Sequence, residues 1–183
     1  MPRIEPVSRS SASPEAARLL DAVKSQMGGV PNLVATMANS PATLQGFLGL
    51  SGALGGGRFD AQHREQIALA VAGANGCDYC ASAHTALGRR HGLAPEELAR
   101  NLAGSASDPR VAATLRFAKR IVATRGRVSA DDLAELRRHG FGDEDIVELV
   151  GHTVLNIFTN YVNHVAETTI DFPLVATASA SAA

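Results

Sequence analysis

The amino-acid sequence predicts an all-α fold, and three of its features support this prediction. The alternation of apolar and polar residues that is typical of half-buried strands is nowhere sustained. Apolar residues recur instead three and four positions apart, which is the spacing of one face of a helix. Helix-start signals, in which a serine or aspartate cap or a first-turn proline precedes a periodic segment, divide the chain into separate helices.

Five helices are expected in the first half of the chain. Ser13-Pro14 and Ser40-Pro41 each combine an N-cap with a proline at the first helical position, and Asp60 caps a later helix. Glycines follow several of these segments and end them. The expected ranges are 14–27, 31–38, 41–54, 61–74 and 77–92.

Four more helices are expected in the second half. Pro95 and Pro109 each begin a helix, and Asp108 caps the second of them. Ser129 and Asp132 form a capping pair at the start of "ADDLAELRRHG". The last and longest helix is expected over about 143–168.

Length and composition indicate one globular domain. A chain of 183 residues with 45% hydrophobic residues can bury a full core without disulfide bonds. We expect a single helical domain over 1–173, with its motif core at 58–92, and a disordered low-complexity tail over 174–183. The run "IALAVAGA" (Ile67 to Ala74) is apolar on every side, so its helix should be surrounded by others or lie at a subunit contact.

Charge and hydropathy exclude several classes of partner. The formal net charge is −1 and no basic run occurs, which argues against nucleic acid or an anionic membrane surface. No stretch approaches the roughly 20 apolar residues of a membrane helix, and the first residues do not form a secretory signal. We therefore expect a cytoplasmic protein. Lasting structural disulfides are rare in that compartment, so the cysteine pair should serve chemistry.

Both cysteines lie in one short stretch, "CDYCASAH", at an expected helix start. Cys77, Cys80 and His84 are three and four residues apart, so the three side chains share one helical face. Helix geometry places the two cysteine Cα atoms roughly 5 Å apart, within the range that a disulfide accepts. The helix N-terminus favours a thiolate, most of all at Cys77, and the imidazole can accept a thiol proton. A reversible dithiol is the favoured interpretation.

Two other interpretations of the pair stay open. The cysteines can be small buried apolar residues, or C-x2-C-x3-H can supply three zinc ligands. A zinc site lacks support because no third cysteine exists and three ligands on one helix give poor tetrahedral geometry. Glu65 precedes Cys77 by twelve residues and reaches the same face if the two helices pack as a hairpin. Otherwise it is an ordinary first-turn acid.

The ordered set of acid, cysteines and histidine resembles a family signature. The pattern E-x11-C-x2-C-x3-H is that of the alkylhydroperoxidase D (AhpD)-like family, within the carboxymuconolactone decarboxylase superfamily; here it comprises Glu65, Cys77, Cys80 and His84. This resemblance covers about 58–92. A second string, "NYVNHVAETTIDFP" over 160–173, is similar to the C-terminal segment of the peroxidase-related branch.

The resemblance implies a helical fold in trimers or hexamers and a thiol peroxidase that needs no metal or haem. It implies that Cys80 attacks the peroxide and that Cys77 resolves the resulting sulfenic acid to a disulfide. His84 and Glu65 would relay protons, and a lipoyl group or a thioredoxin-like protein would reduce the disulfide. Better-known peroxidases of the family have a histidine directly before the second cysteine, where this chain has Tyr79.

Two alternative functions remain at this point. One is a carboxymuconolactone decarboxylase-type lyase, although that branch typically lacks the paired cysteines. The other is a non-catalytic helical oligomer whose cysteines sense redox state or hold zinc.

The last expected helix adds a polar stripe with two interpretations. Its members are spaced four, four and three residues apart: His152, Asn156, Asn160 and Asn163. They form either a second wall of the active site or a set of satisfied core or interface hydrogen bonds, which we favour. His164 lies beside the stripe, and His63 and His91 are expected at the surface. Gly55–Gly57 lacks the spacing and lysine of a phosphate loop.

Overall fold

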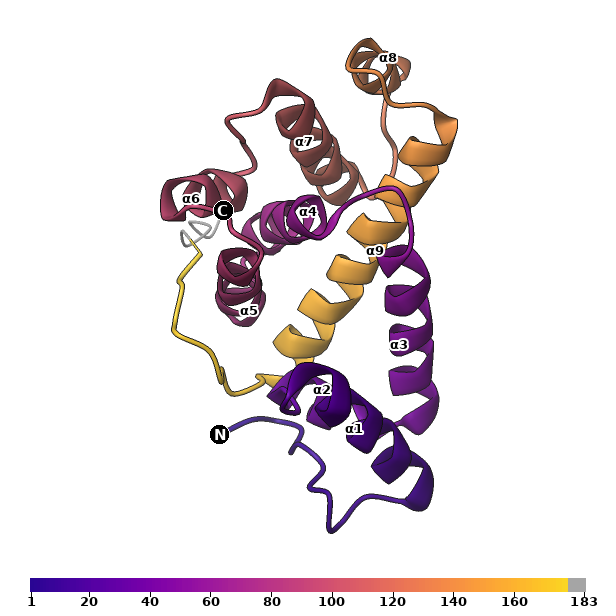
Figure 1. Cartoon of the computed structure of the whole chain (residues 1–183), viewed down its shortest axis with the longest axis vertical. Coiled ribbons are helices and arrows are strands. Elements are labelled where there is room, and N and C mark those ends of the chain that lie inside the picture. The colour runs from indigo at the N-terminus through magenta and orange to yellow at the C-terminus, as the bar shows by residue number, and fades with distance from the viewer. Residues whose placement is uncertain (178–183) are drawn as a thin grey trace.

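The computed structural model describes residues 1–177 and confirms the all-helical prediction, since no strand forms in that part of the chain (Figure 1). The helices are α1 (Pro14–Met27), α2 (Asn32–Met37), α3 (Pro41–Gly55), α4 (Ala61–Asn75), α5 (Asp78–Arg90), α6 (Pro95–Ala103), α7 (Pro109–Thr124), α8 (Ala130–Arg138) and α9 (Asp143–Ala166).

The helices start where the capping residues predicted. The Ser13 and Ser40 side chains accept backbone N–H groups of the first turns of α1 and α3, and Asp60 does the same for α4. Ser129 and Asp132 form a reciprocal capping box at α8. These bonds satisfy N–H groups that have no partner within the helix, which is why short polar residues determine the boundaries.

Helix α4 is the centre of the larger half of the molecule. It contacts α5, α6, α7 and α9, which surround it in Figure 1. Every residue from Ile67 to Ala72 is buried, so the apolar run lies inside the domain. A Cβ at Gly73 would overlap the carbonyl oxygen of Leu102, and this close approach between α4 and α6 requires glycine.

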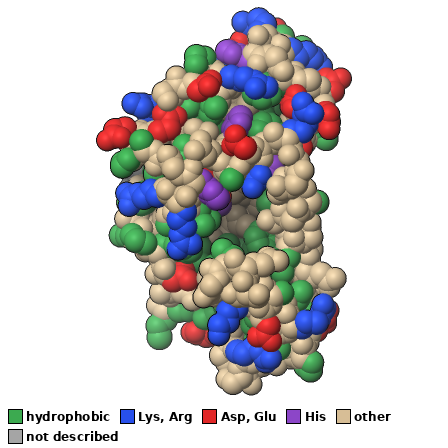
Figure 2. All heavy atoms as spheres, in the orientation of Figure 1, with side chains coloured by type: hydrophobic (Ala, Val, Ile, Leu, Met, Phe, Trp, Pro, Cys, Tyr) green, Lys and Arg blue, Asp and Glu red, His purple; other side chains and the backbone are tan. Residues whose placement is uncertain are grey.

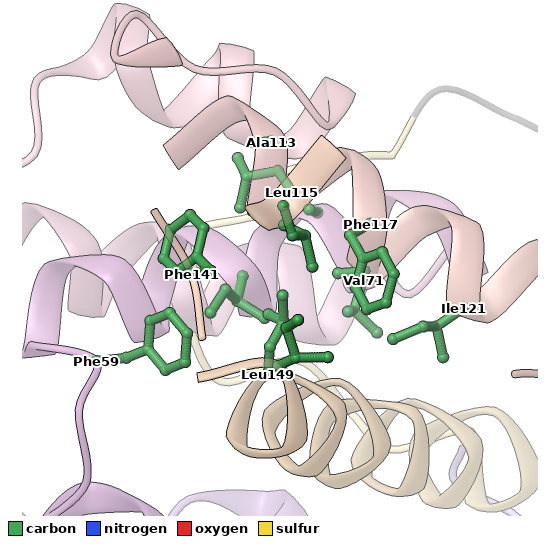
Figure 3. Close-up of a cluster of buried hydrophobic side chains, with 13 residues drawn as sticks. Phe59, Val71, Ala113, Leu115, Phe117, Ile121, Phe141 and Leu149 are labelled. Carbon is green, nitrogen blue, oxygen red and sulfur yellow. The ribbon is translucent and has the colours of Figure 1, made fainter. Parts of the chain in front are cut away.

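Two apolar cores meet along α9. The first packs α4, α7 and α8 against the N-terminal half of α9, around residues such as Val71, Leu115 and Leu149 (Figure 3). The second joins α1, α2 and α3, and Phe158 and Val162 of α9 pack against it. Helix α9 runs diagonally through the molecule and links the two (Figure 1). A site between the cores is therefore bounded by α9 on one side.

The chain after α9 returns along α5. The backbone N–H of Val175 donates to Ser82 Oγ at 2.9 Å, and Thr177 donates to Asp78 Oδ1 through both its N–H and its hydroxyl. Asp171 accepts the N–H of Asn32 at the start of α2. The first part of the expected tail, 174–177, thus lies against α5, and its remainder, 178–183, falls outside the described residues. Among residues 1–177, no helix has the length and apolar character needed to cross a membrane.

Candidate functional site

The two cysteines occupy different positions at the start of α5. Cys77 is the N-cap, and its sulfur accepts the backbone N–H of Cys80 at 3.3 Å. The two residues form a disulfide in this structure, and their Cα atoms are 5.3 Å apart, as the predicted helix geometry requires. The first turn of α5 therefore holds the pair without unwinding.

The two sulfurs also face different surroundings. Both residues are buried, with exposed fractions of 1% for Cys77 and 2% for Cys80. Cys80 lines a cavity, whereas Cys77 does not, and Phe172 and Val175 of the C-terminal segment pack against the cluster that contains both. A small molecule in the cavity can therefore contact Cys80, which lines it, before Cys77, which does not.

Glu65 and His84 form a pair on the wall of the same cavity. Because α4 and α5 pack as a hairpin, Glu65 Oε2 lies 2.7 Å from His84 Nδ1. Both side chains are largely buried, with exposed fractions of 15% and 22%. The structure thus brings three of the four sequence-predicted site residues to the cavity: Cys80, His84 and Glu65.

The cavity lies between the two cores and has a volume of about 450 Å³. Figure 2 shows a hollow in the middle of this face of the molecule, with a histidine and a basic side chain at its rim. Helices α1, α2 and α3 give it a mainly apolar wall, which includes Val23, Leu33, Val34, Phe47 and Leu48. Its charged and imidazole side chains come from α4, α5 and α9, while α1 and α3 add Gln26 and Ser51. The cavity therefore suits an organic molecule with one reactive polar end.

The polar stripe of α9 forms part of the opposite wall. All four of its residues are buried, and His152 and Asn156 line the cavity. Asn160 accepts a hydrogen bond from Asn75 at 2.8 Å, and Asn163 Nδ2 donates to Cys80 Sγ at 3.3 Å.

The hydrogen bonds expected of a purely structural stripe form only in part. Within the stripe, Asn160 Nδ2 and Asn163 Oδ1 have no hydrogen-bond partner, and His152 Nε2 lies 3.5 Å from Glu148 Oε1, too far for a good hydrogen bond. Burial also lowers the pKa of His152, so its imidazole is neutral at neutral pH. His164 is exposed and stacks on Tyr161 instead. The stripe therefore forms core hydrogen bonds and also lines the cavity and contacts Cys80.

Tyr79, which stands where the family histidine is expected, has a structural contact. Its hydroxyl accepts the backbone N–H of Leu33 at 3.1 Å, and its ring packs edge-on against Phe172. Burial, with the nearby carboxylate of Asp171, raises the pKa of the phenol, so it keeps its proton at neutral pH. Tyr79 thus connects α5 to α2.

The two histidines expected at the surface differ. His91 is exposed, as predicted, but His63 is half-buried, packs edge-on against Phe59 and lies 2.7 Å from Thr114 Oγ1. Burial lowers the pKa of His63 to about 4. Its position early in α4 gave no sign of this, because the contact comes from α7. Within residues 1–177, no three His, Cys, Asp or Glu side chains converge as a metal site.

Comparison with known proteins agrees with the predicted family. The sequence profile of the carboxymuconolactone decarboxylase family matches residues 41–124, which include α3, α4, α5, α6 and α7. No curated protein sequence matches the chain.

Solved structures share the fold over nearly the whole chain. An uncharacterized peroxidase-related protein from Ralstonia eutropha JMP134, described as an alkylhydroperoxidase AhpD core, is 26% identical over 93% of this chain and 92% of its own, with a TM-score of 0.84. A peroxidase-related protein from Silicibacter sp. TM1040 is 25% identical over 91% of each chain, with a TM-score of 0.77. The debrominase Bmp8, in complex with 2,3,4-tribromopyrrole, is 20% identical over 92% of this chain and 91% of its own, with a TM-score of 0.77.

The fold, the cysteine pair and these likenesses support one class of protein: residues 41–124 match the carboxymuconolactone decarboxylase family, and the whole chain is similar in structure to AhpD-like, peroxidase-related proteins.

Proposed function

We propose that the chain is a thiol-dependent peroxidase that reduces organic hydroperoxides through its cysteine pair. The observation that carries this proposal is the position of Cys80, which lines the same cavity as the Glu65–His84 pair. A thiol becomes a good nucleophile only as the thiolate, and a positioned base supplies that form.

The reaction consists of two balanced steps. The Cys80 thiolate attacks the terminal oxygen of the hydroperoxide, the O–O bond breaks, and the alcohol leaves with a proton. The Cys77 thiolate then attacks the sulfenic acid, releasing water with a second proton and forming the disulfide. A dithiol of the lipoyl or thioredoxin-like class reduces that disulfide and is itself oxidised.

His84 and Glu65 would move the protons in these steps. The carboxylate of Glu65 accepts a hydrogen bond from His84 Nδ1–H, an arrangement that leaves Nε2 without a proton. Nε2 then takes the proton of the Cys80 thiol and returns it to the leaving alkoxide. We assign Tyr79 no part in this relay, because burial keeps its phenol protonated and its hydroxyl accepts the Leu33 N–H of α2.

The apolar cavity wall favours organic hydroperoxides over hydrogen peroxide. About 450 Å³ is far more space than hydrogen peroxide needs, and most of the wall offers it no hydrogen bond. A substrate with a sizeable apolar group gains affinity by leaving water for this wall.

We also propose a cytoplasmic homo-oligomer, a trimer or hexamer, as the working form. Exposed apolar side chains follow one face of α9, and they support burial of this face against another copy: Val147, Val150, Val154, Tyr161 and Val165. Light scattering should give the mass of a trimer or hexamer, and a monomeric mass at micromolar concentration would contradict this.

Peroxide consumption by the reduced protein tests the proposed function. One equivalent of cumene hydroperoxide per protomer should disappear rapidly, and mass spectrometry should find the Cys77–Cys80 disulfide. Cys80→Ser should abolish consumption, whereas Cys77→Ser should react once and accumulate a sulfenic acid on Cys80. Full consumption by Cys80→Ser would refute the proposal.

The same preparation distinguishes the two alternatives. Decarboxylation of a lactone acid that survives alkylation of both cysteines would indicate a lyase. Slow oxidation of the pair without turnover, under any dithiol, would indicate a redox sensor.

A further inference from the structure

The sulfur of each cysteine accepts one N–H hydrogen bond, but the donors come from different parts of the chain. Cys77 Sγ accepts the backbone N–H of Cys80, within the first turn of its own helix. Cys80 Sγ accepts the side-chain Nδ2–H of Asn163, which lies 83 residues later on α9. The donor to Cys77 Sγ is therefore a backbone N–H of the α5 N-terminus, whereas the donor to Cys80 Sγ is a side-chain amide from α9.

The surroundings of Asn163 show that this amide is oriented toward the sulfur. Asn163 is 5% exposed, and its Oδ1 is buried without a hydrogen-bond partner. Leaving a buried amide oxygen unpaired costs about 1–3 kcal/mol. Asn160, one turn earlier, instead uses its oxygen to accept from Asn75. Asn160 Nδ2 is also without a partner, so the unpaired end alone does not distinguish the two residues; what distinguishes Asn163 is that its paired end contacts a cysteine sulfur.

We propose that Asn163 is a positioning residue that donates a hydrogen bond to the Cys80 thiolate and so stabilises the reactive form of that cysteine. Asn163 does not line the cavity, so it approaches the sulfur from a side other than the one the substrate uses. A hydrogen bond to the charged form favours that form, and it is strongest when the acceptor carries a full charge.

Other charged groups near Cys80 also affect its thiolate. Glu65 lines the same cavity, Asp78 lies in the first turn of α5 and Asp171 lies near Tyr79, and each disfavours a further negative charge, whereas Arg64, which also lines the cavity, favours it. The neighbouring imidazoles are His84 on α5 and His152 on α9, and His152 is neutral because burial lowers its pKa. Among the described residues, the N–H that reaches Cys80 Sγ comes from Asn163.

Alkylation of Cys80 in a Cys77→Ser background tests the proposal without any peroxide. The rate of reaction with iodoacetamide, followed against pH, reports the fraction of thiolate. Asn163→Leu should move the midpoint upward by about one pH unit, which is roughly a tenfold lower thiolate fraction at neutral pH. Asn163→Asp keeps the shape of the side chain but adds a charge, so it should move the midpoint further in the same direction.

Thermal unfolding of the variants distinguishes stabilisation of the thiolate by Asn163 from a purely structural role. Asn163→Leu removes a donor and an unpaired acceptor together, so thermal unfolding should be unchanged or slightly raised. The matched control is Asn160→Leu, which leaves Asn75 without its acceptor. That variant should unfold at a lower temperature but keep the alkylation midpoint.

An unchanged midpoint in Asn163→Leu would overturn the proposal. If that variant does not fold, Asn163→Ala, which removes the donor without adding a charge, decides instead. The kinetic consequence for peroxide rests on the proposed function, but the alkylation profile does not. A wild-type protein that fails to consume hydroperoxide while Asn163→Leu still shifts the midpoint would refute the peroxidase and leave the thiolate contact standing.

Discussion

The two polar walls of the cavity are built in different ways. The α4–α5 wall holds Glu65, Cys80 and His84 within twenty residues of sequence, on two helices joined by a tight turn at Gly76. The α9 wall holds His152, Asn156 and, behind the sulfur, Asn163, which reach the site only because α9 crosses both cores. The first wall is a local motif, whereas the second is a product of packing.

This difference predicts that the α4–α5 wall transfers protons and that the α9 wall adjusts the charge of the sulfur and the shape of the cavity. Groups that transfer protons must keep a fixed distance from the sulfur, and a short helical hairpin provides that distance directly. Groups that adjust the sulfur's charge or shape the cavity can come from any element packed nearby. Variants on the two walls should therefore differ in the size and the kind of their effects.

The largest expected effect is on the α4–α5 wall. His84→Ala should lower the rate of peroxide reduction by about 10²-fold or more, the usual contribution of a positioned acid–base group. Glu65→Gln should lower it somewhat less, because the amide still holds the imidazole but no longer favours the required tautomer. Stopped-flow measurement with cumene hydroperoxide gives both rates.

The matched variant on the other wall is His152→Gln. Its loss of rate should stay below about tenfold, since the neutral His152 lines the cavity without a hydrogen bond to the reacting sulfur. Equal losses of the peroxide-reduction rate in the His84 and His152 variants would contradict the distinction between the two walls and assign proton transfer to both.

The next largest effect is on the pH dependence of folding stability, and it comes from His63, which does not line the cavity. Burial lowers the pKa of His63 to about 4 in the folded chain, below the usual value of 6.5. The unfolded chain therefore binds more protons, so stability is fully present above pH 6.5 and is lost as the pH falls toward 4. The loss from this group is at most about 3 kcal/mol.

Urea unfolding at a series of pH values measures this dependence. His63→Gln should flatten the curve between pH 6.5 and 4, while the alkylation midpoint of Cys80 stays where it is. A curve with the same slope in the variant would assign the acid sensitivity to other groups, with the buried His152 of the α9 wall as the next candidate.

The smallest effect is expected at Tyr79, which lies on the α4–α5 wall but acts as a link to α2. Tyr79→Phe removes the acceptor of the Leu33 N–H and should cost about 1–2 kcal/mol of stability. The rate of peroxide reduction should change by less than about twofold, because the phenol takes no part in the relay. A large loss of rate with an intact fold would place the hydroxyl in the chemistry after all.

Much of the fold followed from local signals. Caps such as Ser13, Asp60 and Ser129 and stops such as Gly28 and Gly76 act within one turn of their own helix, so the sequence shows them directly. The spacing of Cys77, Cys80 and His84 placed the side chains on one face for the same reason. The resemblance to a known signature then singled out Glu65, whose contact with His84 the structure confirms.

What the sequence by itself determined is therefore the set of helices and the short motif, because both depend on interactions between residues close in the chain. The tertiary structure alone decided which cysteine lines the cavity, that Tyr79 binds α2, and that Asn163 reaches Cys80. These contacts join residues 46 and 83 positions apart. They arise from the way two apolar cores pack against one long helix, and no local pattern of residues encodes that arrangement.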